Sequence, residues 1–225
     1  MNKTASLICI TLLSACTESA APKAAEPSGY GEKTTREPAK PAPPKGALSL
    51  GDAAPLSSVA MPGVDGAEHS IEGVKGEKGT LVIFTCNHCP YVKAWESRTV
   101  AAANMALDKG IGVIAINAND PEAHAEDGME GMKARAEKTR MKYPYVVDQG
   151  EVAKAHGAAK TPELYLYDAD LELVYHGAVD DNSRSADAVE KTYLVDAIHA
   201  LAAGEPIPNP ETKALGCSIK YRPDA

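Results

Sequence analysis

Large aromatic side chains and clusters of positive charge are both scarce in this sequence. It contains one Trp and one Phe beside nine Tyr, which argues against an extended aromatic binding platform. The 23 Lys and Arg are dispersed along the chain, and the formal net charge is −8. Because proteins that bind nucleic acid need a basic surface, we expect no nucleic-acid partner.

Cysteine is also sparse, and no second pair of Cys or His stands at the spacing of a zinc site. Cys9, Cys16, Cys86, Cys89 and Cys217 are the five cysteines, and only two of them are close together in the sequence. A zinc knuckle requires two such pairs. We therefore expect no resident metal and no organic cofactor, and we interpret the close pair as redox-active.

The N-terminal segment predicts export. Lys3 is followed by a short apolar stretch over residues 5–13, which is too short for a membrane-spanning helix and typical of a signal peptide. We assign the signal to residues 1–15. Cys9 would then leave with it, and the close cysteine pair would work in an oxidising compartment.

The tetrapeptide Leu13-Ser14-Ala15-Cys16 resembles the lipobox of bacterial lipoproteins. In these proteins cleavage precedes the cysteine, which then receives lipid, so the resemblance implies a lipid anchor on Cys16. Thr17, and not Asp, follows Cys16; by resemblance to diderm lipoproteins this favours the outer membrane over the inner one. The alternative is an ordinary signal peptide in which Cys16 is incidental.

Residues 16–47 are rich in Ala, Pro, Lys, Glu, Ser and Thr and contain almost no large apolar side chain. Such a segment cannot bury enough apolar surface to fold, and we expect it to be a flexible tether. Residues 48–225 are long enough for one domain with its own core.

Within this domain the apolar pattern predicts strands and helices in alternation. Two apolar strands and the helix between them form a βαβ unit with parallel strands. Short strands precede this unit, and a hairpin and a final helix end the domain, so we expect a thioredoxin-like α/β fold: a central mixed sheet flanked by helices, with extra N-terminal strands. The predicted strands are residues 57–61, 68–71, 81–84, 111–117, 145–147, 164–167 and 171–176, and the predicted helices are residues 91–108, 128–140, 151–156 and 186–203.

The close cysteine pair, Cys86 and Cys89, directly follows the apolar run 81–84. We expect it to lie between a strand and a helix, with Cys86 at the positive N-terminal end of the helix. There the helix dipole and unpaired backbone N–H groups stabilise a thiolate, which thiol–disulfide exchange requires. A permanent structural disulfide is the alternative.

Three neighbouring features support redox chemistry. His88 lies between the thiols, where a partly positive imidazole lowers a thiol pKa and makes the couple more oxidising. Pro90 suits the first helical turn. Thr161-Pro162 lies about 75 residues after the pair and directly before a strand. In a thioredoxin-like fold this proline is expected to be cis, to pack against the dithiol and to expose backbone for partner strands.

Four stretches resemble a bacterial branch of the thioredoxin-like redoxins with the alkyl hydroperoxide reductase/thiol-specific antioxidant domain. They are residues 84–94, which include Cys-Asn-His-Cys-Pro-Tyr-Val, and residues 117–120, 161–163 and 216–221. The resemblance implies that Cys86 is the exposed attacking thiol and Cys89 the buried resolving thiol. In this branch a Cys often precedes the Thr-Pro and an Asp often follows it, whereas this chain has Lys160 and Glu163.

The resemblance does not imply peroxidase activity. A peroxiredoxin has Pro and Thr seven and three residues before its peroxidatic cysteine, and those positions before Cys86 hold Gly79 and Ile83. We therefore predict a thiol–disulfide oxidoreductase that acts on protein thiols and disulfides together with a redox partner, with an antioxidant peroxidase as one alternative.

The other alternative is copper binding by Cys86 and Cys89, with His88 or Cys217 as a further ligand. Copper-delivering relatives of this fold carry Cys-x-x-x-Cys, and the spacing here is shorter. Cys217 is a candidate third redox thiol, although a lone cysteine is commonly a small buried residue. Glu163 is expected to be an exposed carboxylate at a strand edge, and His124, Met129, Met132, His156, His176 and His199 are expected to have ordinary structural positions.

Overall fold

The computed structural model describes residue 46 and residues 48–223. The predicted signal peptide (residues 1–15), Cys16 and all of the predicted tether except residue 46 lie outside these residues. No helix among them is both long enough and apolar enough to cross a membrane.

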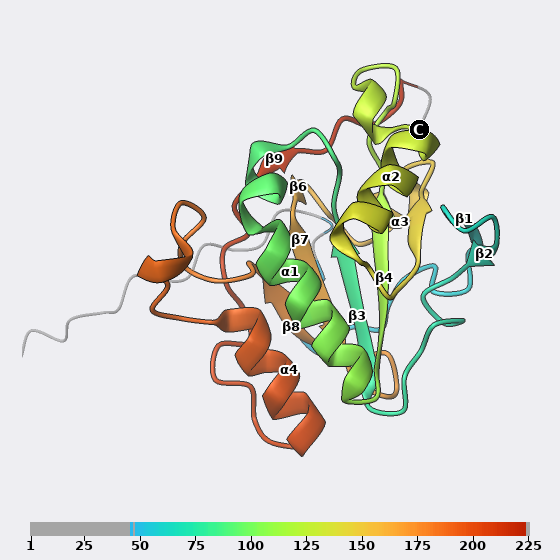
Figure 1. Ribbon diagram of the computed structural model, residues 1–225. Coiled ribbons are helices and arrows are strands. Elements are labelled where there is room, and N and C mark those ends of the chain that lie inside the picture. Colours follow the sequence, from blue (N-terminus) through green and yellow to red (C-terminus); the bar gives the residue numbers. More distant parts are fainter. Residues whose placement is uncertain (1–45, 47, 224–225) are drawn as a thin grey trace, which may run out of the picture. The chain divides into compact units, whose positions relative to one another are not determined.

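A five-stranded mixed sheet forms the centre of the fold, in the order β5-β4-β3-β7-β8 (Figure 1). The middle strand, β3, is parallel to β4 and antiparallel to β7. β4 and β5 are also parallel. The strands of this sheet are β3 (Gly79–Phe84), β4 (Ile111–Asn117), β5 (Tyr145–Val147), β7 (Glu163–Tyr167) and β8 (Leu173–Gly177). Two small sheets pair β1 (Met61–Pro62) with β2 (Glu68–His69), and β6 (Lys160–Thr161) with β9 (Cys217–Ser218).

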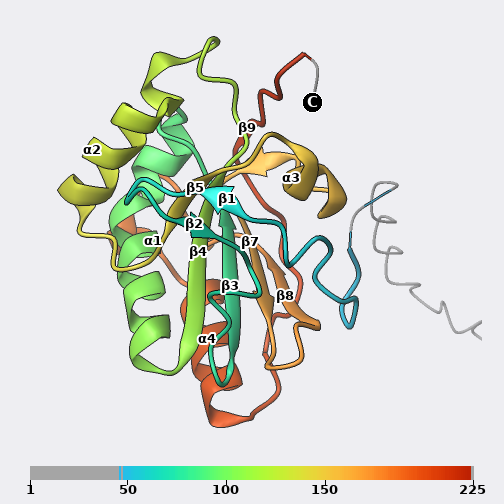
Figure 2. The same cartoon turned by 90° about the vertical axis from the view of Figure 1, so that its right-hand side faces the viewer.

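Helices cover both faces of the sheet, as the second view shows (Figure 2). Along β3 the side chains alternate, so that Leu81 and Ile83 face one core cluster and Val82 and Phe84 face the other. The helices that contribute to the first cluster are α1 (Pro90–Asp108), α2 (Met129–Thr139) and α4 (Tyr193–Ala203). The short helix α3 (Glu151–Ala155) contributes to the second cluster. Among the described residues there are also two 3-10 turns, η1 (Ala125–Asp127) and η2 (Ala186–Ala188).

The structure confirms the thioredoxin-like fold class and corrects two predicted elements. The long final helix begins at Tyr193, whereas residues 186–188 form only a 3-10 turn. These residues are exposed, so a helix there would have no apolar face to bury. Of the predicted strand over residues 57–61, residues 57–58 are a turn and 59–60 are irregular, and the pairing with residues 68–69 begins only at Met61.

His156 is fully buried just after α3, on the face of the sheet opposite α1. Its ring packs edge-on against Phe84, Tyr165 and Tyr167, and its Nδ1–H donates to the Val152 carbonyl at 2.8 Å. Burial in this apolar surrounding lowers the pKa of His156 from 6.5 to about 4. The ring therefore stays neutral in the folded protein at a pH where it is protonated in the unfolded chain.

This difference predicts a loss of stability in mild acid. Between pH 6.5 and about 4 the unfolded chain binds the additional proton, so the free energy of unfolding falls as the pH falls. We expect His156 to contribute a decrease of about 2 kcal/mol between pH 7.5 and pH 5. Urea unfolding at both pH values measures it, and a His156→Phe variant should show a decrease that is smaller by this amount. Equal decreases in both proteins would contradict the assignment.

Candidate redox site

The two neighbouring cysteines lie where the central strand β3 passes into α1. Cys86 follows β3 by two residues, and Cys89 is the N-cap residue of α1, with Pro90 in its first turn. The structure therefore corrects the expectation that Cys86 lies at the helix N-terminus, because Cys89 holds that position. Cys86 is also not exposed: 1% of its surface and 0% of that of Cys89 is accessible, and both are free thiols.

The segment directly before β7 packs against both thiols. The Thr161–Pro162 peptide bond is cis, as the sequence predicted. The Thr161 hydroxyl lies 3.3 Å from the sulfur of Cys86, and the Thr161 carbonyl oxygen lies 3.2 Å from the sulfur of Cys89. The predicted packing of this segment against the dithiol is thus confirmed.

Negative charge in the reduced site is favoured on Cys89. A hydrogen bond from the Cys86 thiol lowers the pKa of Cys89, and the backbone N–H groups of Val92 and Cys217 lower it further. The same bond from Cys86 raises the pKa of Cys86, as do its burial and the nearby carboxylate of Asp127. The two thiols therefore titrate as a pair, with the first proton lost at the helix N-cap.

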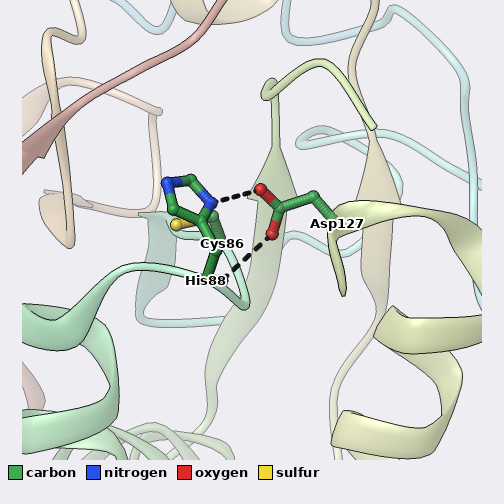
Figure 3. A group of neighbouring side chains, drawn as sticks. All are labelled: Cys86, His88 and Asp127. Atoms are coloured by element: carbon green, nitrogen blue, oxygen red, sulfur yellow. Dashed lines mark hydrogen bonds and ion pairs between the residues drawn. The ribbon is translucent and has the colours of Figure 1, made fainter. Parts of the chain in front are cut away.

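Asp127 anchors the loop between the cysteines (Figure 3). Its side chain is fully buried in η1. Its Oδ1 accepts the backbone N–H groups of Asn87 at 2.6 Å and of His88 at 3.3 Å, and its Oδ2 accepts Nδ1–H of His88 at 2.5 Å. The imidazole is thus fixed beside Cys86 and paired with a negative charge, which offsets part of the positive charge expected from His88.

Further contacts hold this loop in place. The Asn87 side chain donates to the Glu126 carbonyl at 2.6 Å and accepts from the Tyr145 hydroxyl at 3.1 Å. The ring of His124 stacks on the ring of His88 with centroids 3.7 Å apart. His124 is thus part of the site, contrary to the expectation of an ordinary loop position, and Met132 is buried in the core.

Glu163 holds the backbone that leads into the cis-proline segment. Its Oε2 accepts the backbone N–H groups of Ala159 and Lys160, at 2.8 and 2.9 Å, and its Oε1 lies 2.8 Å from Nε2 of His176. Burial opposes the charge of Glu163, but these bonds prevail and lower its pKa. The expectation of an exposed edge carboxylate is wrong, since 5% of the residue is accessible.

Cys217 lies beside the dithiol although it is 128 residues away from Cys89 in the sequence. β9 pairs antiparallel with β6, which places Cys217 opposite Thr161. Cys217 packs against the cluster of Cys86, Cys89 and Val92. The backbone of Thr161 is therefore occupied by the chain itself, and the expectation that it is exposed for a partner strand is wrong in this conformation.

Three atoms of the site could also hold a metal ion. The sulfur of Cys86, a ring nitrogen of His88 and a carboxylate oxygen of Asp127 lie within 4.8 Å of one another. A thiolate, an imidazole and a carboxylate together suit Zn²⁺, and the carboxylate is a poor ligand for Cu(I). In this structure, however, the imidazole and the carboxylate bind each other, so a metal would have to displace their hydrogen bond.

With this geometry established, comparison with known proteins identifies the family. The model of the AhpC/TSA family matches residues 50–176, more than half of the chain. The chain belongs to the AhpC/TSA family. This match includes both cysteines of the motif and the cis-proline and ends before β9.

Two solved structures are similar over most of the chain. An uncharacterised conserved protein from Geobacillus kaustophilus is 41% identical, with a TM-score of 0.72 and coverage of 79% of this chain and 94% of that one. A hypothetical protein from Sinorhizobium meliloti 1021 is 32% identical, with a TM-score of 0.72 and coverage of 79% and 97%.

A third structure shares the fold. It is the thioredoxin domain of a thiol-disulfide oxidoreductase from Bacteroides vulgatus, which is 19% identical with a TM-score of 0.53 and coverage of 69% and 99%. Among curated proteins, none matches this chain.

The Asp127 carboxylate generates a prediction about the redox potential. The carboxylate repels negative charge in the site, as the raised pKa of Cys86 shows, so Asp127→Asn should lower the pKa at which the coupled pair loses its first proton and stabilise the reduced protein. We expect the midpoint potential to rise by on the order of 30 mV for each pKa unit. Equilibration with glutathione buffers measures the shift.

Glu126→Gln provides the matched control. It removes the same charge from the adjacent residue, whose side chain is 60% exposed and pairs with Lys93 at 3.0 Å. We expect its potential to equal that of the wild type, because exposed charge is screened by solvent. An unchanged or lower potential in Asp127→Asn would contradict the role given to Asp127.

Proposed function

We propose that this protein is a thiol–disulfide oxidoreductase whose redox centre is the Cys86–Cys89 pair. The observation that carries the proposal is that both free thiols contact Thr161, the residue directly before the cis-proline. One of them, Cys89, is also the N-cap residue of α1. Both sulfurs are held within the same small site, with a charge-stabilising helix end beside one of them.

The exchange proceeds in two steps, the formation of a mixed disulfide and its resolution. In the reducing direction, Cys86 passes its proton to the Cys89 thiolate, with which it shares a hydrogen bond, and its sulfur attacks one sulfur of a partner disulfide. An S–S bond forms between Cys86 and the partner, and the partner's other sulfur leaves as a thiolate that takes the proton from Cys89. The thiolate of Cys89 then attacks the sulfur of Cys86, which releases the partner's second thiolate. The partner gains two electrons and two protons, and the enzyme becomes the Cys86–Cys89 disulfide. Oxidation of a partner is the same sequence in reverse.

His88 and Asp127 are positioning residues in this scheme. Asp127 fixes the loop that carries Cys86 through the backbone N–H groups of Asn87 and His88. The imidazole donates to Asp127, and this bond holds the ring beside the sulfur of Cys86. No organic cofactor takes part in this proposal, and the partners are protein thiols and disulfides.

The exchange can be tested with matched serine variants. Wild-type protein should catalyse the rearrangement of disulfides in a scrambled protein substrate, and a Cys86→Ser/Cys217→Ser double variant should lower the rate at least to that of free thiols, because Cys89 then has no second thiol in the site. Cys89→Ser should instead accumulate a mixed disulfide on Cys86, detected by mass spectrometry. Full activity of the double variant would contradict the proposal.

A metal-binding role is the second candidate, favoured by the closeness of Cys86, His88 and Asp127. The sequence suggested copper held by Cys86 and Cys89, with His88 or Cys217 as a further ligand. Metal analysis of the purified reduced protein distinguishes these functions: stoichiometric copper or zinc that is lost in Cys86→Ser would replace the redox proposal. The positions seven and three residues before Cys86 remain Gly79 and Ile83, both buried in β3, which disfavours a peroxidase.

The location of the protein belongs to the same proposal. The apolar stretch over residues 5–13 and the tetrapeptide ending in Cys16 support export followed by lipidation of Cys16. The protein would then be extracytoplasmic and anchored at the outer membrane in preference to the inner one. Incorporation of labelled palmitate that persists in Cys16→Ser would contradict the anchor.

A further inference from the structure

The C-terminal strand brings a third thiol to the redox centre. β9 pairs with β6 so that Cys217 is opposite Thr161, the residue that contacts both other cysteines. Gly216 permits this approach, because a Cβ atom there would lie 2.1 Å from the Thr161 carbonyl oxygen. The position of Cys217 is therefore a specific feature of the fold, set by backbone pairing and by a glycine that no larger residue can replace without a shift.

Cys217 contacts one particular sulfur of the pair. Cys217 packs on the cluster of Cys86, Cys89 and Val92, and the thiol of Cys89 is close enough to raise the pKa of Cys217. Both other thiols, those of Cys86 and Cys217, therefore act on the sulfur of Cys89 and lower its pKa. Of these three sulfur-bearing residues, Cys217 alone is partly accessible, whereas Cys86 and Cys89 are buried.

We propose that Cys217 is a third redox thiol that replaces Cys86 as the disulfide partner of Cys89. In this way it carries electrons between the buried pair and partner proteins. In the oxidised protein the thiolate of Cys217 attacks the sulfur of Cys89. The Cys89–Cys217 bond forms, the Cys86–Cys89 bond breaks, and Cys86 leaves as a thiolate. The exchange moves the disulfide without net oxidation.

A partner thiolate can then attack the accessible sulfur of Cys217 and form a mixed disulfide with it, which leaves Cys89 as a thiolate. A second thiolate of the partner attacks the partner sulfur in this bond. The partner becomes a disulfide, and Cys217 is released in the reduced state. The enzyme has gained the two electrons that the partner lost.

The charges around Cys217 are compatible with this attack. Burial and the bond to Cys89 raise the pKa of Cys217 to about 11 in the reduced protein, while Lys220 and Lys160 act in the opposite direction. Oxidation of Cys89 removes the negative charge from that sulfur, and with it a cause of the high pKa. The two lysines then favour the Cys217 thiolate at the moment when it is required.

The direct test uses Cys86→Ser, which leaves Cys89 and Cys217 as the two thiols of the site. The reduced full-length variant is equilibrated with glutathione disulfide, quenched in acid, alkylated and mapped by peptide mass spectrometry. We expect a Cys89–Cys217 disulfide formed by transfer of two electrons to glutathione disulfide. A variant that carries only glutathione adducts on Cys217, with no internal disulfide, would overturn the proposal.

A kinetic comparison tests the role in electron transfer even if Cys86→Ser does not fold. Oxidised wild-type protein is re-reduced either by reduced thioredoxin, a protein dithiol, or by dithiothreitol. Cys217→Ser should slow the reaction with thioredoxin by roughly tenfold, and the reaction with dithiothreitol much less, because a large thiol can reach only an accessible sulfur. Equal effects on the two reactions, or no effect on either, would contradict the proposal.

Ser218→Ala is the matched control on β9. Its exposed hydroxyl accepts a bond from the Lys220 ammonium at 2.6 Å, and the variant keeps the charge of this ammonium and the Cys217 thiol, so it should keep the wild-type rates. The inference rests on the proposed function, but the two can fail separately. If Cys217→Ser still forms the Cys86–Cys89 disulfide while no Cys89–Cys217 disulfide appears in Cys86→Ser, only the third-thiol proposal fails.

Discussion

Thr161 is the residue through which the three thiols of the domain are brought together. Its hydroxyl faces Cys86, its carbonyl oxygen faces Cys89, and its backbone pairs with Cys217. It belongs to β6 and directly precedes the cis-proline and β7, a strand that pairs with the central strand β3 along its length. The position of the redox centre is therefore fixed by the pairing in the middle of the sheet, where both faces are buried.

Two buried carboxylates hold the two backbone segments that meet at this point. Asp127 accepts the N–H groups of Asn87 and His88 on the cysteine side, and Glu163 accepts those of Ala159 and Lys160 on the proline side. Each also binds a histidine, His88 and His176 respectively. Backbone N–H groups that would otherwise be unsatisfied in loops are thereby paired, which keeps irregular segments in place without regular secondary structure.

The sequence predicted the parts of this arrangement that depend on local pattern. The short apolar runs 81–84 and 111–117 are typical of buried strands, and Cys86-Asn87-His88-Cys89 and Thr161-Pro162 are recognised by the chemistry of neighbouring residues. Asp127 was missed because it lies 40 residues from Asn87 in a polar loop, where nothing local distinguishes it from an exposed acid. The only available signal in the sequence was the polar loop after β4, the strand that lies parallel to β3 and ends at the same edge of the sheet as the cysteines.

The pairing of β9 was missed for the same reason, since two residues of a short strand carry no periodicity. Glu163 was judged from its position at a strand edge, but the segment over residues 159–160 and His176 cover it. Residues 186–192 have a composition compatible with a helix, yet only the part from Tyr193 onward presents an apolar face to the sheet. Distant contacts, and not local propensity, decide all three positions.

The equilibrium between the full-length protein and glutathione tests the central claim, that Cys86 and Cys89 form a reversible redox couple. The fraction of the Cys86–Cys89 disulfide is measured by peptide mapping over a series of ratios of reduced to oxidised glutathione. The account predicts a single two-electron transition with a midpoint potential more oxidising than that of thioredoxin, above about −270 mV. A disulfide that stays intact across the series, or a lower midpoint, would contradict it.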